Sequence, residues 1–459
     1  MITSAAPQAG ANSAADPSWA WAPYAPDRQR PWTLQWAGHL FRRAGFGATW
    51  EQLQEALAGG PQRAIDQLVR RPSESATVAA SAATAGQAGS LESLRAWWLR
   101  QMLETESPLQ EKMTLFWHGH FGISMSRVKD ARLMAAHLQT LRSHALGSYR
   151  ELLRATSQDP ALFLGFNAES SRKALPNENL ARQLMGGLSL GPGVCDEQDV
   201  KEAARAFTGW FVLRGSLRFF EREHDSGVKT VLSQQGPWTP DDVLRIVLDR
   251  REPAQLLVRK TYRWLINEVE EPADGLLAPL VESFSKSYDM RQLVETMLRS
   301  NLFFSPVAYR QRIKSPVEFA LGIVRGLAGI TATLPLGAAL AGLGQALGEP
   351  PTVQGWAGGR CWLNAATISG RIALARALLS PEGAYAGKPD PSTVAQANNL
   401  SDPDSAVTFF LKAYLQDDLP EETRQALQDA ARAAQREPGQ QWLRKTVLAV
   451  VSLPDFQLC

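Results

Sequence analysis

Cysteine, long hydrophobic runs and an excess of one charge are all scarce in this 459-residue chain. The three cysteines, Cys195, Cys361 and Cys459, cannot build a disulfide framework, and their spacing fits no zinc-binding motif. No apolar run approaches the roughly 18 residues that a membrane-spanning helix needs, so no membrane span is expected. The 48 lysines and arginines nearly balance 46 acidic residues. A net charge of +2 gives little electrostatic basis for nucleic-acid binding.

Several well-known catalytic motifs are also absent. The chain has no Gly-x-x-x-x-Gly-Lys-Ser/Thr loop and no Gly-x-Gly-x-x-Gly after a strand, so no nucleotide-phosphate cradle is expected. It has no Gly-x-Ser-x-Gly elbow, which argues against a serine hydrolase. The N-terminal segment lacks the basic start and the apolar stretch of a signal peptide. The sequence as written therefore predicts a cytoplasmic protein, although a start codon set too far downstream would hide an export signal.

Apolar residues recur at helical spacing along most of the chain. Hydrophobic residues make up 44% of the sequence, which suits a globular protein, and 14 tryptophans stand against 7 tyrosines. We predict a mainly α fold, a multi-helix globular body with a small antiparallel β insertion near residues 210–232. The predicted organisation is a disordered tail (1–30), N-terminal helices (31–71), a flexible linker (72–90), a central helical domain (91–380), a second linker (381–402) and C-terminal helices that pack on the body (403–459). Trp19, Trp21 and Tyr24 could instead dock the tail onto the body.

Local chemistry marks where helices start and where strands lie. Ser107 followed by Pro108 supplies an N-cap and a first-turn proline. Asn177 can cap a helix over 178–188, and Asp196 can cap a helix over 197–208. The β-type residues fill 210–214, 217–224 and 228–232, with an Asp-Ser-Gly turn between the last two runs. These three runs make up the predicted β insertion.

Two histidines are candidate metal ligands. His118 and His120 supply imidazoles, which suit a divalent transition metal. Residues two apart on a helix point roughly 200° apart, so both can chelate one ion only if the helix ends there. Gly119 and Gly122 make such an ending plausible. In the alternative interpretation, both rings bond backbone carbonyl groups within a packed core.

Glu178, His224 and Asp225 are the candidate catalytic residues. His224 and Asp225 lie beside the predicted turn, and Glu178 opens a helix that could approach from another side. With the two candidate metal ligands, they would form a His/carboxylate pocket able to activate water. Asp225 could also orient His224 as a general base. Equally, Glu178 could complement its helix dipole and Asp225 could belong to an ordinary turn.

Trp356, Arg182 and Lys229 are the candidate ligand-binding residues. Trp356 lies in a glycine-rich loop, where its indole could stack on a sugar or an aromatic ligand, or could fill a gap in the packing. Lys229 follows His224 and Asp225 in one polar cluster. Arg182 ends the short polar segment that contains Glu178.

Short polar and aromatic motifs follow one another along the chain. They are Phe116-Trp117-His118-Gly119-His120-Phe121, Asp159-Pro160-Ala161, Pro176-Asn177-Glu178-Asn179, Thr208-Gly209-Trp210, His224-Asp225-Ser226-Gly227 and Pro350-Pro351. In number and order, these motifs resemble the bacterial family named domain of unknown function 1800. The resemblance spans about residues 38–459.

The resemblance implies little biochemistry, because the family is named for lacking an assigned function. Its members are often exported and often encoded beside a second family related to alkaline phosphatases and sulfatases, which implies a protein of that kind as a partner. This chain departs from the family pattern at Asn167 and Gln183, where amides replace carboxylates of similar shape. If those acids hold a metal or move protons in relatives, that chemistry is weakened or lost here.

Two functions are therefore open on the sequence alone, and whether the chain is an enzyme is undecided. The first is a metal- or acid/base-dependent enzyme with a His/carboxylate pocket. The second is a non-enzymatic scaffold, or a partner of a phosphatase/sulfatase-like protein, which the amides and the abundance of tryptophan favour. The enzyme hypothesis requires that imidazoles and acids far apart in the chain share one water-accessible cavity.

Overall fold

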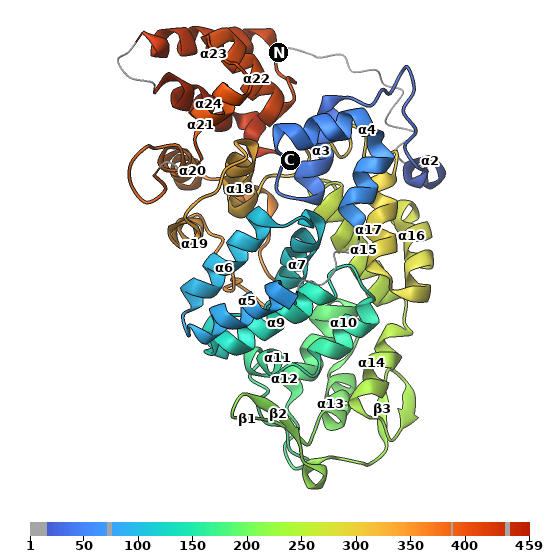
Figure 1. Cartoon of the computed structure of the whole chain (residues 1–459). Coiled ribbons are helices and arrows are strands. Elements are labelled where there is room, and N and C mark those ends of the chain that lie inside the picture. Colours follow the sequence, from blue (N-terminus) through green and yellow to red (C-terminus); the bar gives the residue numbers. More distant parts are fainter. Residues whose placement is uncertain (1–15, 71–75, 387–388, 437–440) are drawn as a thin grey trace.

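The computed structural model describes residues 16–70, 76–386, 389–436 and 441–459, and helices dominate these ranges (Figure 1). Within them, strands form only two antiparallel sheets of two strands each. The predicted mainly α fold with a small β insertion is therefore confirmed. In the described part of the chain, no helix is both long and apolar enough to cross a membrane.

Helix α7 (Pro108–Phe121) runs through the middle of the body (Figure 1). Pro108 occupies its first turn, as predicted, because a residue there needs no N–H bond within the helix. The helix ends at Gly122, which adopts the left-handed conformation that glycine tolerates best. Apart from Gly119, every residue of α7 is buried. The helix therefore carries its charged and histidine side chains into the core.

One group of helices packs around α7, and a second group packs beside the first. The first group contacts α7 directly and consists of α3 (Leu34–Ala44), α4 (Trp50–Val69), α6 (Leu91–Glu104) and α9 (Ala131–Ser143). The second group contacts α4 through α17 (Met290–Arg299) and also contains α2 (Pro17–Trp21), α15 (Glu252–Leu265) and α16 (Asp274–Ser287). Short helices complete this part of the body: α8 (Met125–Val128), α10 (Tyr149–Thr156) and α11 (Pro160–Gly165).

Residues 16–30, predicted as part of a disordered tail, dock onto the body, whereas residues 1–15 lie outside the described residues. The Trp21 indole N–H donates to the Leu276 carbonyl oxygen at 2.6 Å. Tyr24 is buried, and its hydroxyl donates to the Arg30 carbonyl oxygen at 2.8 Å. Burial of these aromatic rings offsets the entropy lost in ordering the segment.

Most of the segment predicted as a flexible linker at 72–90 forms helix α5 (Ala76–Gln87) instead; residues 72–75 lie outside the described residues. Alanine favours a helix more than any other residue, and its small side chain lets α5 pack closely against α6 and α9. The Trp97 indole N–H donates to the Ser81 hydroxyl at 2.9 Å. The second predicted linker also contains a helix, α21 (Pro391–Ala397). An ion pair between Asp390 and Arg444 connects this helix to the C-terminal helices. Residues 387–388 of this linker are outside the described ranges.

The β insertion consists of two separate hairpins at the end of the body away from both described termini (Figure 1). Strand β1 (Trp210–Leu213) pairs with β2 (Ser216–Phe219), and β3 (Lys229–Val231) pairs with β4 (Gln234–Gly236). The predicted turn at 225–227 therefore joins the two sheets rather than two paired strands. Helices α13 (Glu197–Ala206) and α14 (Pro240–Leu248) flank the hairpins, and Asp196 caps α13 as predicted.

The helix predicted at 178–188 changes character along its length. It begins as α12 (Glu178–Arg182), capped by Asn177, and continues as the π-helix η1 (Gln183–Leu190). Gly186 and Gly187 lie within η1, where their freedom of backbone conformation suits the unusual geometry.

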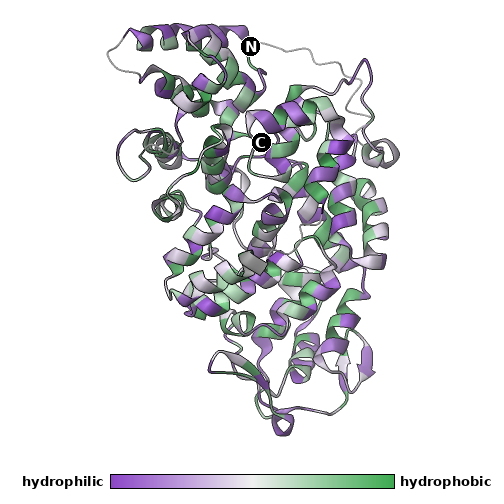
Figure 2. Cartoon of the chain, viewed as in Figure 1, coloured by the Kyte–Doolittle hydropathy of each residue, from purple (hydrophilic) through white to green (hydrophobic). Residues whose placement is uncertain are grey.

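The C-terminal third forms a further helical layer (Figure 1). It contains α18 (Pro316–Gly326), α19 (Thr333–Gly342), η3 (Gly359–Trp362), α20 (Ala365–Leu378), α22 (Pro403–Leu415), α23 (Glu421–Gln435), α24 (Trp442–Ser452) and η4 (Pro454–Gln457). Figure 2 shows the outermost of these helices, α23, as mostly hydrophilic, and only three of its residues are buried. Hydrophobic residues elsewhere form one core that runs from the N-terminal helices to this layer.

Candidate active site

A glycine-rich loop covers the end of α7 and forms one wall of the candidate site. A Cβ atom at Gly355 would lie 2.3 Å from the Gly119 carbonyl oxygen, and one at Gly122 would lie 2.3 Å from the Val353 carbonyl oxygen. Gly122 and Gly355 also have positive φ angles, which glycine adopts at little cost. These close approaches place Trp356 against α7.

A cavity of about 180 Å³ lies between this loop, α7 and α15. This volume is below the roughly 300–1,000 Å³ of sites for drug-sized ligands, so the cavity suits a small molecule. Its aromatic walls include Phe116, Trp264, Trp356 and Trp362. Its ionisable side chains are His120, Lys260, Arg263, Glu268 and Arg312.

Lys260 and His120 contact each other in this cavity. The His120 Nε2 atom lies 3.1 Å from the Leu188 carbonyl oxygen, which can only accept a hydrogen bond. Nε2 therefore carries the proton of the neutral ring, and Nδ1 accepts a bond from the Lys260 Nζ atom at 3.0 Å. Tyr149 donates to the same Leu188 carbonyl oxygen at 2.6 Å. The π-helix η1 thus fixes the tautomer of the histidine that faces the lysine.

Burial changes the protonation of both residues. It lowers the pKa of Lys260 from 10.5 to about 8, because the charged amine loses its solvation. Burial holds the pKa of His120 well below its ordinary value, and the positive charge of Lys260 makes a smaller contribution in the same direction. His120 is therefore a neutral hydrogen-bond acceptor, while Lys260 exchanges its proton within a working pH range.

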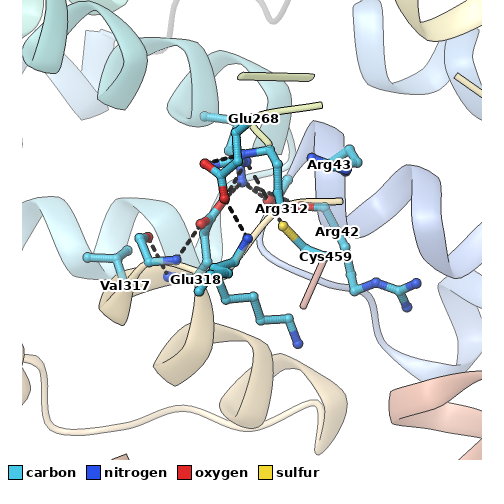
Figure 3. A network of polar contacts seen from close by, with 12 residues as sticks. Arg42, Arg43, Glu268, Arg312, Val317, Glu318 and Cys459 are labelled. Atoms are coloured by element: carbon cyan, nitrogen blue, oxygen red, sulfur yellow. Dashed lines mark hydrogen bonds and ion pairs between the residues drawn. The ribbon is translucent and has the colours of Figure 1, made fainter. Parts of the chain in front are cut away.

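A buried ion network holds two of the cavity's charged side chains in place (Figure 3). Arg312 lies 3.2 Å from Glu318 and 3.6 Å from Glu268, and Lys112 of α7 also bonds Glu318. Burial by itself would raise the pKa of Glu318, but the charges of Arg312 and Lys112 outweigh burial and hold it well below its ordinary value. The Ile313 backbone N–H donates to Glu268 at 2.6 Å. The network thereby positions Glu268 and Arg312 at the cavity.

Positive charge prevails among the side chains that line the cavity. Lys260, Arg263 and Arg312 are the basic residues of the lining and Glu268 is its carboxylate, while Glu271 and Glu318, which pair with Arg263 and Arg312, are not among the lining residues. The Arg312 guanidinium also lies over the Trp264 ring, 4.6 Å from its centroid, an arrangement that favours a fixed cation. The cavity combines flat apolar walls with the amine of Lys260 and the guanidinium groups of Arg263 and Arg312, a lining that suits a small organic anion.

A family model described as "Protein of unknown function (DUF1800)" matches residues 39–458. The chain belongs to this family. The resemblance inferred from the sequence motifs is therefore confirmed. No curated protein and no solved structure matches the chain. Membership of DUF1800 assigns no activity to the chain.

The first DUF1800 motif places its two histidines in different surroundings. His118 Nε2 accepts a bond from the Gly348 backbone N–H at 3.1 Å, and its ring packs against Trp98 and Trp356. Its Nδ1 atom has no partner among the residues that the structure describes. Burial, with a smaller contribution from His137, lowers the pKa of His118 to about 3, so the ring stays neutral. His118 is thus a core residue, whereas His120 lines the cavity.

The structure does not bring His118 and His120 together as ligands of a single metal ion. Helix α7 continues through Phe121, so residues two apart point in different directions. Both Nε2 atoms are also engaged by backbone groups. Within the described ranges, no three His, Cys, Asp or Glu side chains are grouped so that they could hold a metal ion.

Glu178 and Arg182 lie on α12 and pair with each other. Arg182 bonds Glu178 at 3.0 Å and Glu197 at 2.6 Å, and all three side chains are substantially exposed. Asn177 accepts a bond from the Asn179 backbone N–H, as an N-cap does. Glu178 and Arg182 are not among the described residues that line the cavity. Their contacts agree with the interpretation of this DUF1800 motif as a helix start.

His224, Asp225 and Lys229 form a separate cluster beside the hairpins. His224 Nδ1 donates to the Thr208 carbonyl oxygen at 2.9 Å, and Lys229 donates to the Gly227 carbonyl oxygen at 3.0 Å. Asp225 pairs with Arg205 at 2.8 Å rather than with His224. The structure thus does not bring these residues to His120, and a catalytic role for them stays a prediction.

Trp356 is the sequence-based candidate that does reach His120, because both line the cavity. Lys260, Glu268 and Arg312 were not predicted as site residues from the sequence. The sequence of α15 does contain a feature that could have identified Lys260. Lys260 lies on the same helix face as the buried Leu257, three residues before it. A lysine on the apolar face of a helix is uncommon, and it indicates either a buried ion pair or a functional amine.

Replacing Gly355 by alanine is expected to detach the loop from α7. The new Cβ would meet the Gly119 carbonyl group, and the residue would keep a strained positive φ angle. Backbone amides near Trp356 should then exchange hydrogen at least about tenfold faster, as measured by mass spectrometry. Gly383→Ala is the matched control, since Gly383 also has a positive φ angle but a Cβ there would meet nothing within 4 Å. Equal exchange near Trp356 in both variants would contradict the proposed contact.

Proposed function

We propose that this DUF1800 protein is an enzyme that transfers protons on a small organic anion bound in the cavity, with Lys260 as the proton carrier. The observation that carries the proposal is the 3.0 Å contact between Lys260 and His120 inside this cavity. A general base or acid works best when its pKa lies near the working pH. A pKa of about 8 gives Lys260 that property.

The neighbours of Lys260 suit it for this role. One N–H of the amine is directed to His120 Nδ1, which leaves the rest of the amine group for a bound molecule. The carbonyl group of Leu188 keeps His120 in the accepting tautomer. Trp264 and Trp356 line the cavity, and apolar walls of this kind lower the local dielectric and strengthen electrostatic interactions. The cation Arg312 would hold the negative end of the substrate.

Deuterium exchange tests proton transfer directly, because it requires no net reaction. The protein is incubated in D₂O with small carboxylic and 2-oxo acids, and proton NMR follows the loss of signal at the carbon beside the carbonyl group. Lys260→Met should reduce the exchange rate by about 10²-fold or more, the usual contribution of general acid–base catalysis. Lys286→Met is the control, because Lys286 is exposed and pairs with Glu282 on its own helix, away from the cavity. Equal rates in wild type and Lys260→Met would contradict the proposal.

A second candidate function is that of a partner protein for a phosphatase/sulfatase-like neighbour. The observation that favours it is a concentration of exposed apolar side chains near the β insertion, namely Leu175, Leu213, Phe219, Phe220 and Val228. Such side chains often mark surfaces that bind another protein. The protein should no longer co-purify with the phosphatase/sulfatase-like protein when Phe219 and Phe220 are both replaced by serine. Failure of the wild-type protein to bind the purified neighbour would contradict this function.

A further inference from the structure

The amine of Lys260 is placed for a covalent step as well as for proton transfer. It projects into a small cavity with aromatic walls, where it donates a hydrogen bond to the acceptor nitrogen of His120. A neutral lysine amine in such surroundings is a nucleophile toward carbonyl carbon. We infer that Lys260 forms an imine with the carbonyl carbon of a small 2-oxo acid. This inference rests on the proposed function and names the substrate class of the same cavity.

The reaction balances without an oxidant or a reductant. The neutral Lys260 amine attacks the carbonyl carbon, a C–N bond forms, the C=O double bond opens, and the oxygen becomes an alkoxide while the nitrogen still carries both of its protons. His120 Nδ1, which lies 3.0 Å from Lys260 Nζ, accepts the proton that the nitrogen loses. His120 passes that proton to the oxygen, which gives the carbinolamine, and then carries the second proton of the nitrogen to the hydroxyl group, which departs as water. Water leaves, and the C=N bond of the imine remains.

The surroundings of His120 support this exchange of protons. Its Nε2–H bond to the Leu188 carbonyl oxygen stabilises the ring when Nδ1 gains a proton. Because burial disfavours the charged ring, His120 releases the proton quickly. His120 is therefore a positioning and proton-shuttling residue, while Lys260 bonds to the substrate.

The charges of the cavity favour a 2-oxo acid over an uncharged aldehyde. Arg263 and Arg312 line the cavity and remain charged after Lys260 loses its proton, while their partners Glu271 and Glu318 are not among the lining residues. A carboxylate beside the reacting carbonyl group would meet this positive charge. The small volume of about 180 Å³ also restricts the substrate to a short chain or a single ring.

Reductive trapping tests the inference on the full chain. The protein is incubated with pyruvate or glyoxylate and sodium cyanoborohydride, and the adduct is located by peptide mass spectrometry. The expected result is one adduct per chain on Lys260, formed at least ten times faster than on any other lysine. Acetaldehyde, which lacks the carboxylate, should label Lys260 at least ten times more slowly than pyruvate does.

Variants separate the covalent role from a structural one. Lys260→Arg keeps a positive charge and a hydrogen-bond donor for His120, yet it should form no adduct at this position. His120→Asn keeps an acceptor but cannot take up the proton, so trapping should slow by at least tenfold while pyruvate binding is retained. Lys286→Met should trap pyruvate on Lys260 as fast as wild type.

Binding measured without the reductant distinguishes the two proposals. Saturation-transfer NMR reports whether pyruvate or glyoxylate binds to the wild-type protein and whether Trp356→Ala weakens that binding. Binding without an adduct on Lys260 would overturn the imine and leave the proton-transfer function standing. Adducts spread over exposed lysines would also overturn the imine. Neither binding nor trapping of these acids would overturn both the substrate class and the proposed use of the cavity.

Discussion

Glu318→Gln is expected to lower the free energy of unfolding by about 3–5 kcal/mol. Glu318 is buried and compensates two buried cations, Lys112 and Arg312. An amide keeps the shape of the side chain but removes its charge, so both cations would remain in the core with too little compensation. Removal of one partner of a buried ion pair costs far more than the pair itself contributes.

Urea unfolding followed by tryptophan fluorescence measures this change. Glu282→Gln is the control, because Glu282 pairs with Lys286 in full contact with solvent and such pairs contribute at most about 0.5 kcal/mol. The folded-state pKa of Glu318 lies below its ordinary value of 4.5. Its stabilising effect is therefore complete above that value and fades as the pH falls, so wild type and variant should converge in acid. A constant difference down to low pH would contradict this account.

The sequence predicted those features of the fold that depend on neighbouring residues. Asp196 caps α13, and Asn177 caps α12, since an N-cap needs only its own side chain and the next backbone N–H groups. The strands β1 and β3 were also predicted from short runs of β-type residues. Pairing within each hairpin is local as well, although the break between the two sheets was not predicted.

Composition gave the wrong prediction where packing decides the structure. The segment that contains α5 is rich in alanine, serine and threonine, which is typical of a linker, yet it forms a helix because α6 and α9 offer a surface for it. Ser81 illustrates this, since its hydroxyl accepts a bond from Trp97 on another helix. No pattern within the segment reveals that partner.

The candidate site was predictable only in part, for the same reason. Trp356 and His120 were identified from the sequence, and the cavity includes both. Lys260 and Arg312 are separated from them in the chain by many residues, and only the packing of α15 and the ion network brings them together. The sequence favoured His224 and Asp225 because they are neighbours in a motif, but their partners are the Thr208 carbonyl group and Arg205.

Lys260→Met is expected to raise the free energy of unfolding at pH 7 by about 1–3 kcal/mol. Burial lowers the pKa of Lys260 from 10.5 to about 8, and a tenfold change in a protonation equilibrium corresponds to about 1.4 kcal/mol. Below pH 8 the folded protein must hold a charged amine in poorly solvated surroundings, whereas the unfolded chain solvates it freely. Methionine removes that cost but also removes the hydrogen bond to His120, a loss of about 1 kcal/mol.

The pH dependence of this gain identifies its cause. Between about pH 8 and pH 10.5 the unfolded wild-type chain binds more protons than the folded one, so the stability of wild type rises with pH. The advantage of Lys260→Met should therefore be greatest at pH 7 and should disappear or reverse as the pH approaches that of the free amine. Urea unfolding at regular pH intervals measures it, with Lys286→Met as an exposed control whose difference from wild type should stay near zero. An advantage that does not change with pH would mean that Lys260 is not held in an environment that disfavours its charge. It would then lack the property that suits it to carry a proton.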